Sequence, residues 1–204
     1  MTGVHPIEVE SYRILAERVD LSSLAPLDRA VVERMVHATA DLSFVESARI
    51  GDRATAALRD ALVAGAPVVV DAAMVAAGIT RYPTECYLPR IRVAPDGSTR
   101  SAAAFELAAE EHPTGAVFVC GNAPTALFAL LDLHAAGRVE PAAVVGLPVG
   151  FVGAAESKEA LWASPLAEIS ITNVGERGGS PVAAGAVNAM VRVARSGDDP
   201  SGAR

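Results

Sequence analysis

The chain has 204 residues and a mass of 20.9 kDa, a size at which a single domain can bury about 70% of the surface that its unfolded chain exposes. Hydrophobic residues make up 51% and charged residues 20%, which is typical of a compact globular protein and excludes a natively disordered chain. The formal net charge of -7 and the pI near 5.1 give no long-range attraction to nucleic acid or to an anionic membrane surface.

The two cysteines, Cys86 and Cys120, lie in neither a CxxC motif nor a Cys/His cluster. A disulfide framework or a metal site is therefore not expected. The first residues lack the basic start and apolar run of a signal peptide, and no apolar stretch approaches the ~18 residues of a membrane span. We expect a cytoplasmic protein that binds neither nucleic acid nor membrane.

Three helices are predicted in the first third of the chain. Residues 7–16 and 27–38 have the apolar spacing of helices, and Pro26 marks the start of the second. His37 falls in the last turn of that second helix. The third helix covers residues 52–63 and ends at a glycine and a proline that follow it.

From residue 67 onward, short apolar runs alternate with stretches long enough for a helix. Runs that are apolar on successive residues are typical of strands buried on both faces. We therefore predict an α/β fold, a single domain over residues 1–195 with a mostly parallel central sheet and helices on both faces. The predicted strands cover 67–71, 116–120, 142–147 and 169–171, and the predicted helices cover 101–111, 125–136, 157–163 and 181–195.

Two segments have a composition that disfavours helices and long strands. Residues 82–97 contain three prolines, which predict a loop with one short strand at 90–93. Residues 196–204 are rich in Ser, Gly, Asp and Pro, so we predict a disordered tail.

Two junctions between a predicted strand and the next helix, residues 118–125 and 145–153, are rich in glycine. In parallel sheets, ligands bind beyond the carboxyl ends of the strands, where such loops meet. Glycine also serves simply to turn the chain, so the loops alone do not decide between the two roles. The GxGxxG, GxxxxGK[ST], HExxH and GxSxG motifs are absent from the sequence, which excludes several common enzyme classes.

Of the four histidines, His37 has the position best suited to chemistry. At the C-terminal end of a helix, the negative end of the macrodipole favours imidazolium by ~0.3 to 1 kcal/mol. An imidazolium can act as a proton donor near neutral pH. The alternative is a C-terminal cap, which the pattern alone favours.

Taken together, five ordered segments resemble the precorrin-8X methylmutase family over about residues 6–195. Their order and spacing match the family along nearly the whole chain. The segments are RMVHA at 34–38, DAAMV at 71–75 with GITR at 78–81, TRSAAA at 99–104, GNAPTAL at 121–127, and GLPVGFVGAAESKE at 146–159 followed by RGGS at 177–180.

The resemblance implies an isomerase of cobalamin biosynthesis that needs no cofactor and forms a homodimer. In that family a methyl group moves from C-11 to the adjacent C-12 of precorrin-8X, giving hydrogenobyrinate. His37 matches the histidine that protonates the macrocycle and so makes the acceptor carbon more electron-poor. The same reaction on the cobalt-containing ring, giving cobyrinate, is an alternative.

The resemblance also implies a set of residues around the ring, which is flat, apolar and fringed by carboxylates. Arginine side chains suit the carboxylates, hydroxyl groups suit His37 or a carboxylate, and backbone amides after a strand supply further donors. For each residue, ordinary surface or capping chemistry is the alternative. The predicted substrate-binding residues are Ser11, Thr80, Arg81, Arg100, Gly121, Asn122, Ala123 and Arg177.

The chain departs from the family pattern at two places near the predicted pocket. Ala73 stands where an acidic residue is usual, and residues 82–89, from Tyr82 to Pro89, replace the usual stretch after the Thr-Arg pair. Either change can alter the substrate or the turnover. Two further hypotheses are therefore a corrinoid carrier without catalysis and an unrelated small-molecule α/β enzyme.

Overall fold

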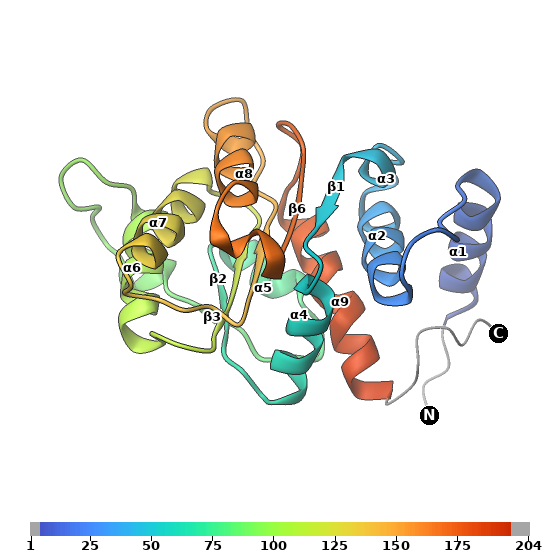
Figure 1. Cartoon of the computed structure of the whole chain (residues 1–204), viewed down its shortest axis with the longest axis horizontal. Helices are drawn as coiled ribbons and strands as arrows, with labels where there is room; N and C mark the ends of the chain where they lie inside the picture. Colours follow the sequence, from blue (N-terminus) through green and yellow to red (C-terminus); the bar gives the residue numbers. More distant parts are fainter. Residues whose placement is uncertain (1–4, 197–204) are drawn as a thin grey trace.

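A computed structural model describes residues 5–196 and shows nine helices of the α type in that range (Figure 1). The predicted tail at 196–204 lies outside the described residues except for Ser196, which ends the last helix. Within residues 5–196, no helix combines the length and apolar character that crossing a membrane requires. The helices are α1 Pro6–Arg18, α2 Pro26–Thr39, α3 Phe44–Ser47, α4 Ala54–Val63, α5 Ala73–Gly78, α6 Arg100–Glu111, α7 Pro124–Ala135, α8 Ala154–Trp162 and α9 Ser180–Ser196.

A single sheet forms the centre of the fold, with the strand order β1-β6-β5-β4-β2-β3. Neighbouring strands are parallel, apart from the edge strand β1, which runs antiparallel to β6. The prediction of a mostly parallel sheet is therefore confirmed. The strands are β1 Ala48–Ile50, β2 Val68–Val70, β3 Glu85–Cys86, β4 Val117–Cys120, β5 Ala143–Gly146 and β6 Ser170–Asn173.

Successive strand residues point to opposite faces of the sheet and build two separate cores. Val119 and Val145 pack with apolar residues of α2, α4 and α9. Phe118 and Val144 pack instead with residues of α6 and α7. Figure 1 shows α6 and α7 on one side of the sheet, α2, α4 and α9 on the other, and α1 outermost beyond α2. Helices thus cover both faces, as predicted.

The proline-rich segment differs from its prediction. The predicted strand at 90–93 is wrong, because residues Leu88–Arg90 form a 3-10 helix and residues 91–93 are irregular. The strand of this segment is β3, whose two residues pair with Val69 and Val70 of β2 at the sheet edge. Prolines cannot donate to a strand ladder, and Pro83 and Pro89 flank this short edge strand, which covers only Glu85–Cys86.

The elements β1, α3 and α5 were not predicted, and all three are short. β1 has three half-buried residues, and α5 has six residues. The helix α5 begins two residues after Asp71 and is important for the site, because it leads into Thr80 and Arg81.

Candidate functional site

The centre of the candidate site is the half-buried imidazole of His37 in the last turn of α2. Its Nδ1 atom lies 2.9 Å from the hydroxyl oxygen of Ser11 on α1. Among residues 5–196, the structure gives its Nε2 atom no hydrogen-bond partner. When Ser11 donates to Nδ1, the neutral ring carries its proton on Nε2. With Nδ1 bound to Ser11, Nε2 is the ring nitrogen that can exchange a proton with a ligand, giving it up when the ring is imidazolium.

Tyr12 covers one face of this imidazole. The two rings are stacked, with centroids 4.8 Å apart and planes inclined by 5°. The phenol oxygen accepts a hydrogen bond of 3.1 Å from Nη1 of Arg34, and the same Nη1 donates to Oε1 of Glu8 at 2.9 Å. The imidazole plane is thus fixed by a ring on one face and by Ser11 at one edge.

The surroundings lower the pKa of His37 below its usual value. Burial is the largest cause, the positive charge of Arg34 adds to it, and the negative charge of Glu8 opposes both. Burial and Arg34 thus act against the contribution of the helix macrodipole, which was expected to favour imidazolium. A lower pKa makes the imidazolium a stronger acid and a less populated one.

The predicted residues Thr80 and Arg81 lie in the turn that follows α5. The backbone N–H of Thr80 donates to the side-chain oxygen of Asn188 on α9 at 2.8 Å, and the Asn188 amide donates to the carbonyl of Gly78 at 2.7 Å. Both Thr80 and Arg81 are exposed. No side-chain partner of Arg81 is present among residues 5–196.

The predicted amide donors at 121–123 serve a buried carboxylate. The carboxylate of Asp71, at the carboxyl end of β2, has no exposed surface. The N–H groups of Gly121, Asn122 and Ala123 donate to it at 3.0, 2.8 and 2.7 Å. These amides thus donate to Asp71, which corrects the expectation that they face a ligand. The side chain of Asn122 is exposed.

Burial raises the pKa of Asp71, and the three amide donors oppose that shift. The thiol of Cys120 also points to this carboxylate, at 3.5 Å. Asp71 therefore ties the end of β2 to the turn after β4 at the carboxyl edge of the sheet. Its role in this structure is to shape that turn.

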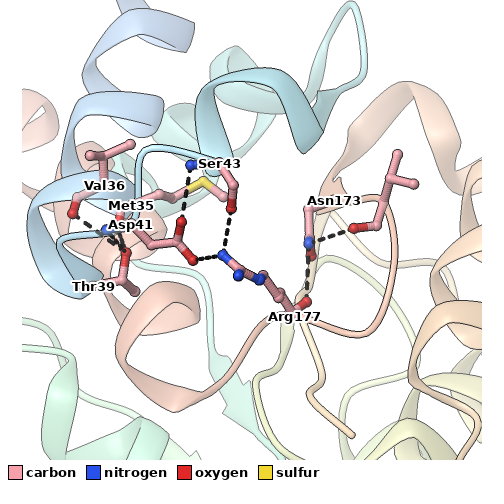
Figure 2. Close-up of polar contacts among 8 residues, drawn as sticks. Met35, Val36, Thr39, Asp41, Ser43, Asn173 and Arg177 are labelled. Atoms are coloured by element: carbon pink, nitrogen blue, oxygen red, sulfur yellow. Dashed lines mark hydrogen bonds and ion pairs between the residues drawn. The ribbon is translucent and has the colours of Figure 1, made fainter. Parts of the chain in front are cut away.

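Arg177, in the loop after β6, reaches the turn that follows α2 (Figure 2). Its Nη1 atom donates to the carboxylate of Asp41 and to the hydroxyl of Ser43, the latter at 2.8 Å. The guanidinium is thus already paired within the protein, one helical turn beyond His37. Its predicted contact with a ligand carboxylate stays a prediction.

Arg100, at the start of α6, is bound to the proline-rich segment. Its Nε atom donates to the carbonyl of Ile91 at 2.7 Å and its Nη2 atom to the carbonyl of Leu88 at 3.1 Å. The same segment is fixed at Tyr87, whose hydroxyl lies within 3.1 Å of side-chain atoms of Glu85, Glu111 and His112. The departure at 82–89 thus forms a braced sheet edge, while Ala73 is an exposed residue at the start of α5.

A cavity of about 450 Å³ opens between α6 and α7, and its lining includes Thr99, Glu106, Thr125, Phe128 and Asp132. His37 is not among its lining residues, so this cavity and the candidate site are separate. Within residues 5–196, no group of three His, Cys, Asp or Glu side chains is arranged to hold a metal ion.

Four residues of this region were not predicted from the sequence: Tyr12, Asp71, Asn188 and Lys158. An asparagine in the apolar helix 181–195 and an aspartate at the end of a buried strand are unusual enough to single out. The buried ammonium of Lys158, which is 1% exposed, donates to Asn173 and to the carbonyl of Arg177. No local pattern marks Tyr12, because its partner His37 is distant in sequence.

Comparison with known proteins gives matches along nearly the whole chain. A family model described as precorrin-8X methylmutase matches residues 6–193. A precorrin-8X methylmutase from Pseudomonas aeruginosa is 42% identical over 193 residues, which cover 89% of this chain and 91% of that protein. A cobalt-precorrin-8 methylmutase from Methanothermobacter thermautotrophicus is 39% identical over 197 residues, 94% of either chain. The solved structure of a precorrin-8X methyl mutase from Thermus thermophilus matches with a TM-score of 0.83 at 36% identity, covering 95% of this chain and 99% of that one.

Proposed function

Because this chain belongs to the precorrin-8X methylmutase family and is an isomerase of cobalamin biosynthesis, we propose that it moves a methyl group from C-11 to C-12 of precorrin-8X with His37 as the proton donor. The observation that carries this proposal is the pairing of Ser11 with Nδ1 of His37, which leaves Nε2 without a protein partner. An isomerisation of this kind needs no redox cofactor, because no electrons enter or leave the ring.

The proton moves in a closed cycle. Imidazolium Nε2–H protonates the conjugated nitrogen system, and the electron-poor C-12 then accepts the methyl group with its bonding pair as the bond to C-11 breaks. His37 recovers the proton when conjugation is restored. Ser11 supports both states of this cycle, because its hydroxyl accepts from Nδ1–H in the imidazolium and also in the neutral Nδ1–H ring that remains after Nε2 has given up its proton.

The charge of the substrate favours this chemistry. In the free protein, burial and Arg34 lower the pKa of His37. Carboxylates of a bound ring near His37 would oppose that shift and favour imidazolium. Protonation of His37 is thus coupled to substrate binding, so that the acid forms when there is a ring to protonate.

Among the predicted arginines, Arg81 is the one that we assign most directly to a ring carboxylate. Its side chain is exposed and has no partner among residues 5–196, whereas Arg100 and Arg177 already donate to protein oxygens. Both of these keep unused N–H groups for a second acceptor. Thr80 is placed beside Arg81, where its exposed hydroxyl can bind the same edge of the ring.

A flat macrocycle needs wide apolar walls, and we propose that a homodimer supplies part of them. Phe151 and Val152, in the glycine-rich loop after β5, are 90% and 89% exposed. Exposed apolar side chains of this size are typical of ligand or subunit contacts. Enclosure from water would protect the activated ring from side reactions.

The test is to mix the purified protein with precorrin-8X and, separately, with its cobalt complex, and to follow the visible spectrum without added metal or nucleotide. We expect conversion of at least one ring, and the faster one identifies the physiological form. Both forms are included because proteins named for each are 39 to 42% identical to this chain. Tight binding of both rings with unchanged spectra would instead indicate a carrier.

A further inference from the structure

The backbone of Arg81 is held in a conformation that its side chain does not favour. Its φ angle is +66°, in the left-handed region, where a bulky side chain crowds the following carbonyl. Glycine occupies this region without strain, yet the chain has arginine here. The surrounding structure must therefore stabilise the turn.

The stabilising contacts come from α9. The Asn188 side chain accepts from the N–H of Thr80 and donates to the carbonyl of Gly78, so one amide group bridges both sides of Ile79. The carbonyl of Arg81 itself accepts from Nη1 of Arg195 at 3.1 Å. Gly78 lies so close to α9 that a Cβ atom added there would be 2.7 Å from Cβ of Ala184. The turn is thus closely packed against α9 and hydrogen-bonded to it.

The same helix supports the one that carries His37. One turn before Asn188, Gly185 faces α2, and a Cβ atom added there would lie 3.2 Å from the carbonyl oxygen of Arg34 and 3.3 Å from Cβ of Ala38. Adjacent turns of α9 therefore contact α2 and the Thr80–Arg81 turn. This arrangement fixes the backbone of Arg81 relative to that of His37.

The guanidinium of Arg81 is free of protein partners among residues 5–196, although its backbone is constrained. If the strain at this residue served the stability of the fold, its side chain should pack against the protein or form an ion pair that offsets the cost. Here the constrained backbone fixes the direction of the exposed Arg81 side chain, which has no partner among residues 5–196. Backbone strain of this kind is typical of ligand-binding positions. We therefore infer that the strained backbone positions the Arg81 guanidinium for a ligand.

We propose that Asn188 is a positioning residue, which holds the strained turn at Arg81 so that the guanidinium meets a carboxylate of the bound ring. This inference rests on the proposed function for the identity of the ring. It assigns to Asn188 a role in substrate affinity that acts only through Arg81.

A double-mutant cycle tests this coupling. Hydrogenobyrinate is titrated against the wild type, Arg81→Ala, Asn188→Leu and the double variant, and kcat and KM are measured with precorrin-8X. We expect each single variant to weaken binding about tenfold with kcat within about twofold of the wild type. In the Arg81→Ala background, Asn188→Leu should have no further effect on binding. Losses that add in the double variant would overturn the proposal.

Two further variants keep the test decisive. Asn188→Asp retains the acceptor for Thr80 and loses the donor to Gly78, so it should fold and bind with an intermediate loss. Arg81→Gly should raise the midpoint of urea unfolding while it weakens ring binding, because glycine accepts the left-handed conformation. An unchanged or lower midpoint would refute the strain. If the wild type binds no ring, the proposed function fails, while the unfolding result still reports on the turn.

Discussion

The imidazole of His37 lies parallel to the phenol ring of Tyr12, with 5° between the planes and 4.8 Å between the centroids. The residues belong to different helices, α2 and α1, and Ser11 contacts the edge of the same imidazole. The helix α1 lies outside α2, so these contacts connect the outermost helix to the candidate site. We therefore propose that α1 orients the His37 imidazole through Ser11 and Tyr12.

Removing the stacked ring should slow the reaction without preventing ring binding. Tyr12→Leu leaves the imidazole free to turn about its bond to the backbone, so we expect kcat to fall about tenfold. Tyr12→Phe keeps the stacked face and loses the bond from Arg34, so its kcat should stay within about threefold of the wild type. Equal losses in both variants would show that the stack itself has no role.

Besides burial, the charge of Arg34 should lower the pKa of His37. Arg34→Gln removes a cation that disfavours imidazolium, so the pKa of His37 should rise, as followed by NMR of the imidazole protons. Arg29→Gln, on the same helix but paired with Glu33, is the matched control and should leave it unchanged. A titration that is identical in all three proteins would exclude Arg34 as a cause.

The lowered pKa of His37 also predicts how stability depends on pH. Between the folded pKa and the usual 6.5, the unfolded chain binds more protons at this site than the folded protein. The free energy of unfolding should therefore fall as pH drops below 6.5. The drop should be smaller in His37→Ala, and urea denaturation at several pH values measures it.

Lys158 should affect stability in alkaline solution. Burial lowers its pKa from 10.5 to about 8, with the nearby Cys120 opposing the shift. Between these values the unfolded chain binds more protons, so this residue should raise the free energy of unfolding with pH, by about 3 kcal/mol over the whole interval. Lys158→Met should lack this rise. Parallel pH dependences of the two proteins would contradict the assignment.

The end of α2 offers a test of backbone strain near His37. Ala40 has φ of +53°, and its N–H donates to the carbonyl of Val36 at 2.7 Å, which closes the helix. Ala40→Gly should stabilise the protein by about 1 kcal/mol, because this conformation is free of strain only for glycine. Ala16→Gly, exposed within α1, should instead destabilise it by about 1 kcal/mol. Thermal and urea unfolding measure both changes.

The fold was largely predictable because its strongest patterns are local. Buried strands such as β4 are apolar on every residue, and proline or glycine marks the ends of helices such as α2. The parallel order follows from the helix-length stretches between strands. The edge strands β1 and β3 were missed or misplaced because two or three half-exposed residues have no periodicity, and their strand form depends on pairing with β6 and β2.

The site was predictable where the family resemblance names a residue, and less so where partners are distant in sequence. Ser11 and His37 are brought together as the resemblance implied. The backbone amides at 121–123 were expected to face a ligand, but they donate to Asp71. Arg177 already donates to Asp41, while its predicted contact with a ligand stays a prediction. A sequence shows which groups can donate hydrogen bonds, whereas the acceptor that receives them is decided by the packing of the whole chain.

The most direct test of the proton donor is single-turnover conversion of precorrin-8X by the wild type and by His37→Ala, with ring binding measured in parallel. We predict that His37→Ala binds the ring with nearly the wild-type affinity and rearranges it at least about a hundredfold more slowly. Conversion at the wild-type rate by His37→Ala would contradict the account, because another group would then have to protonate the macrocycle.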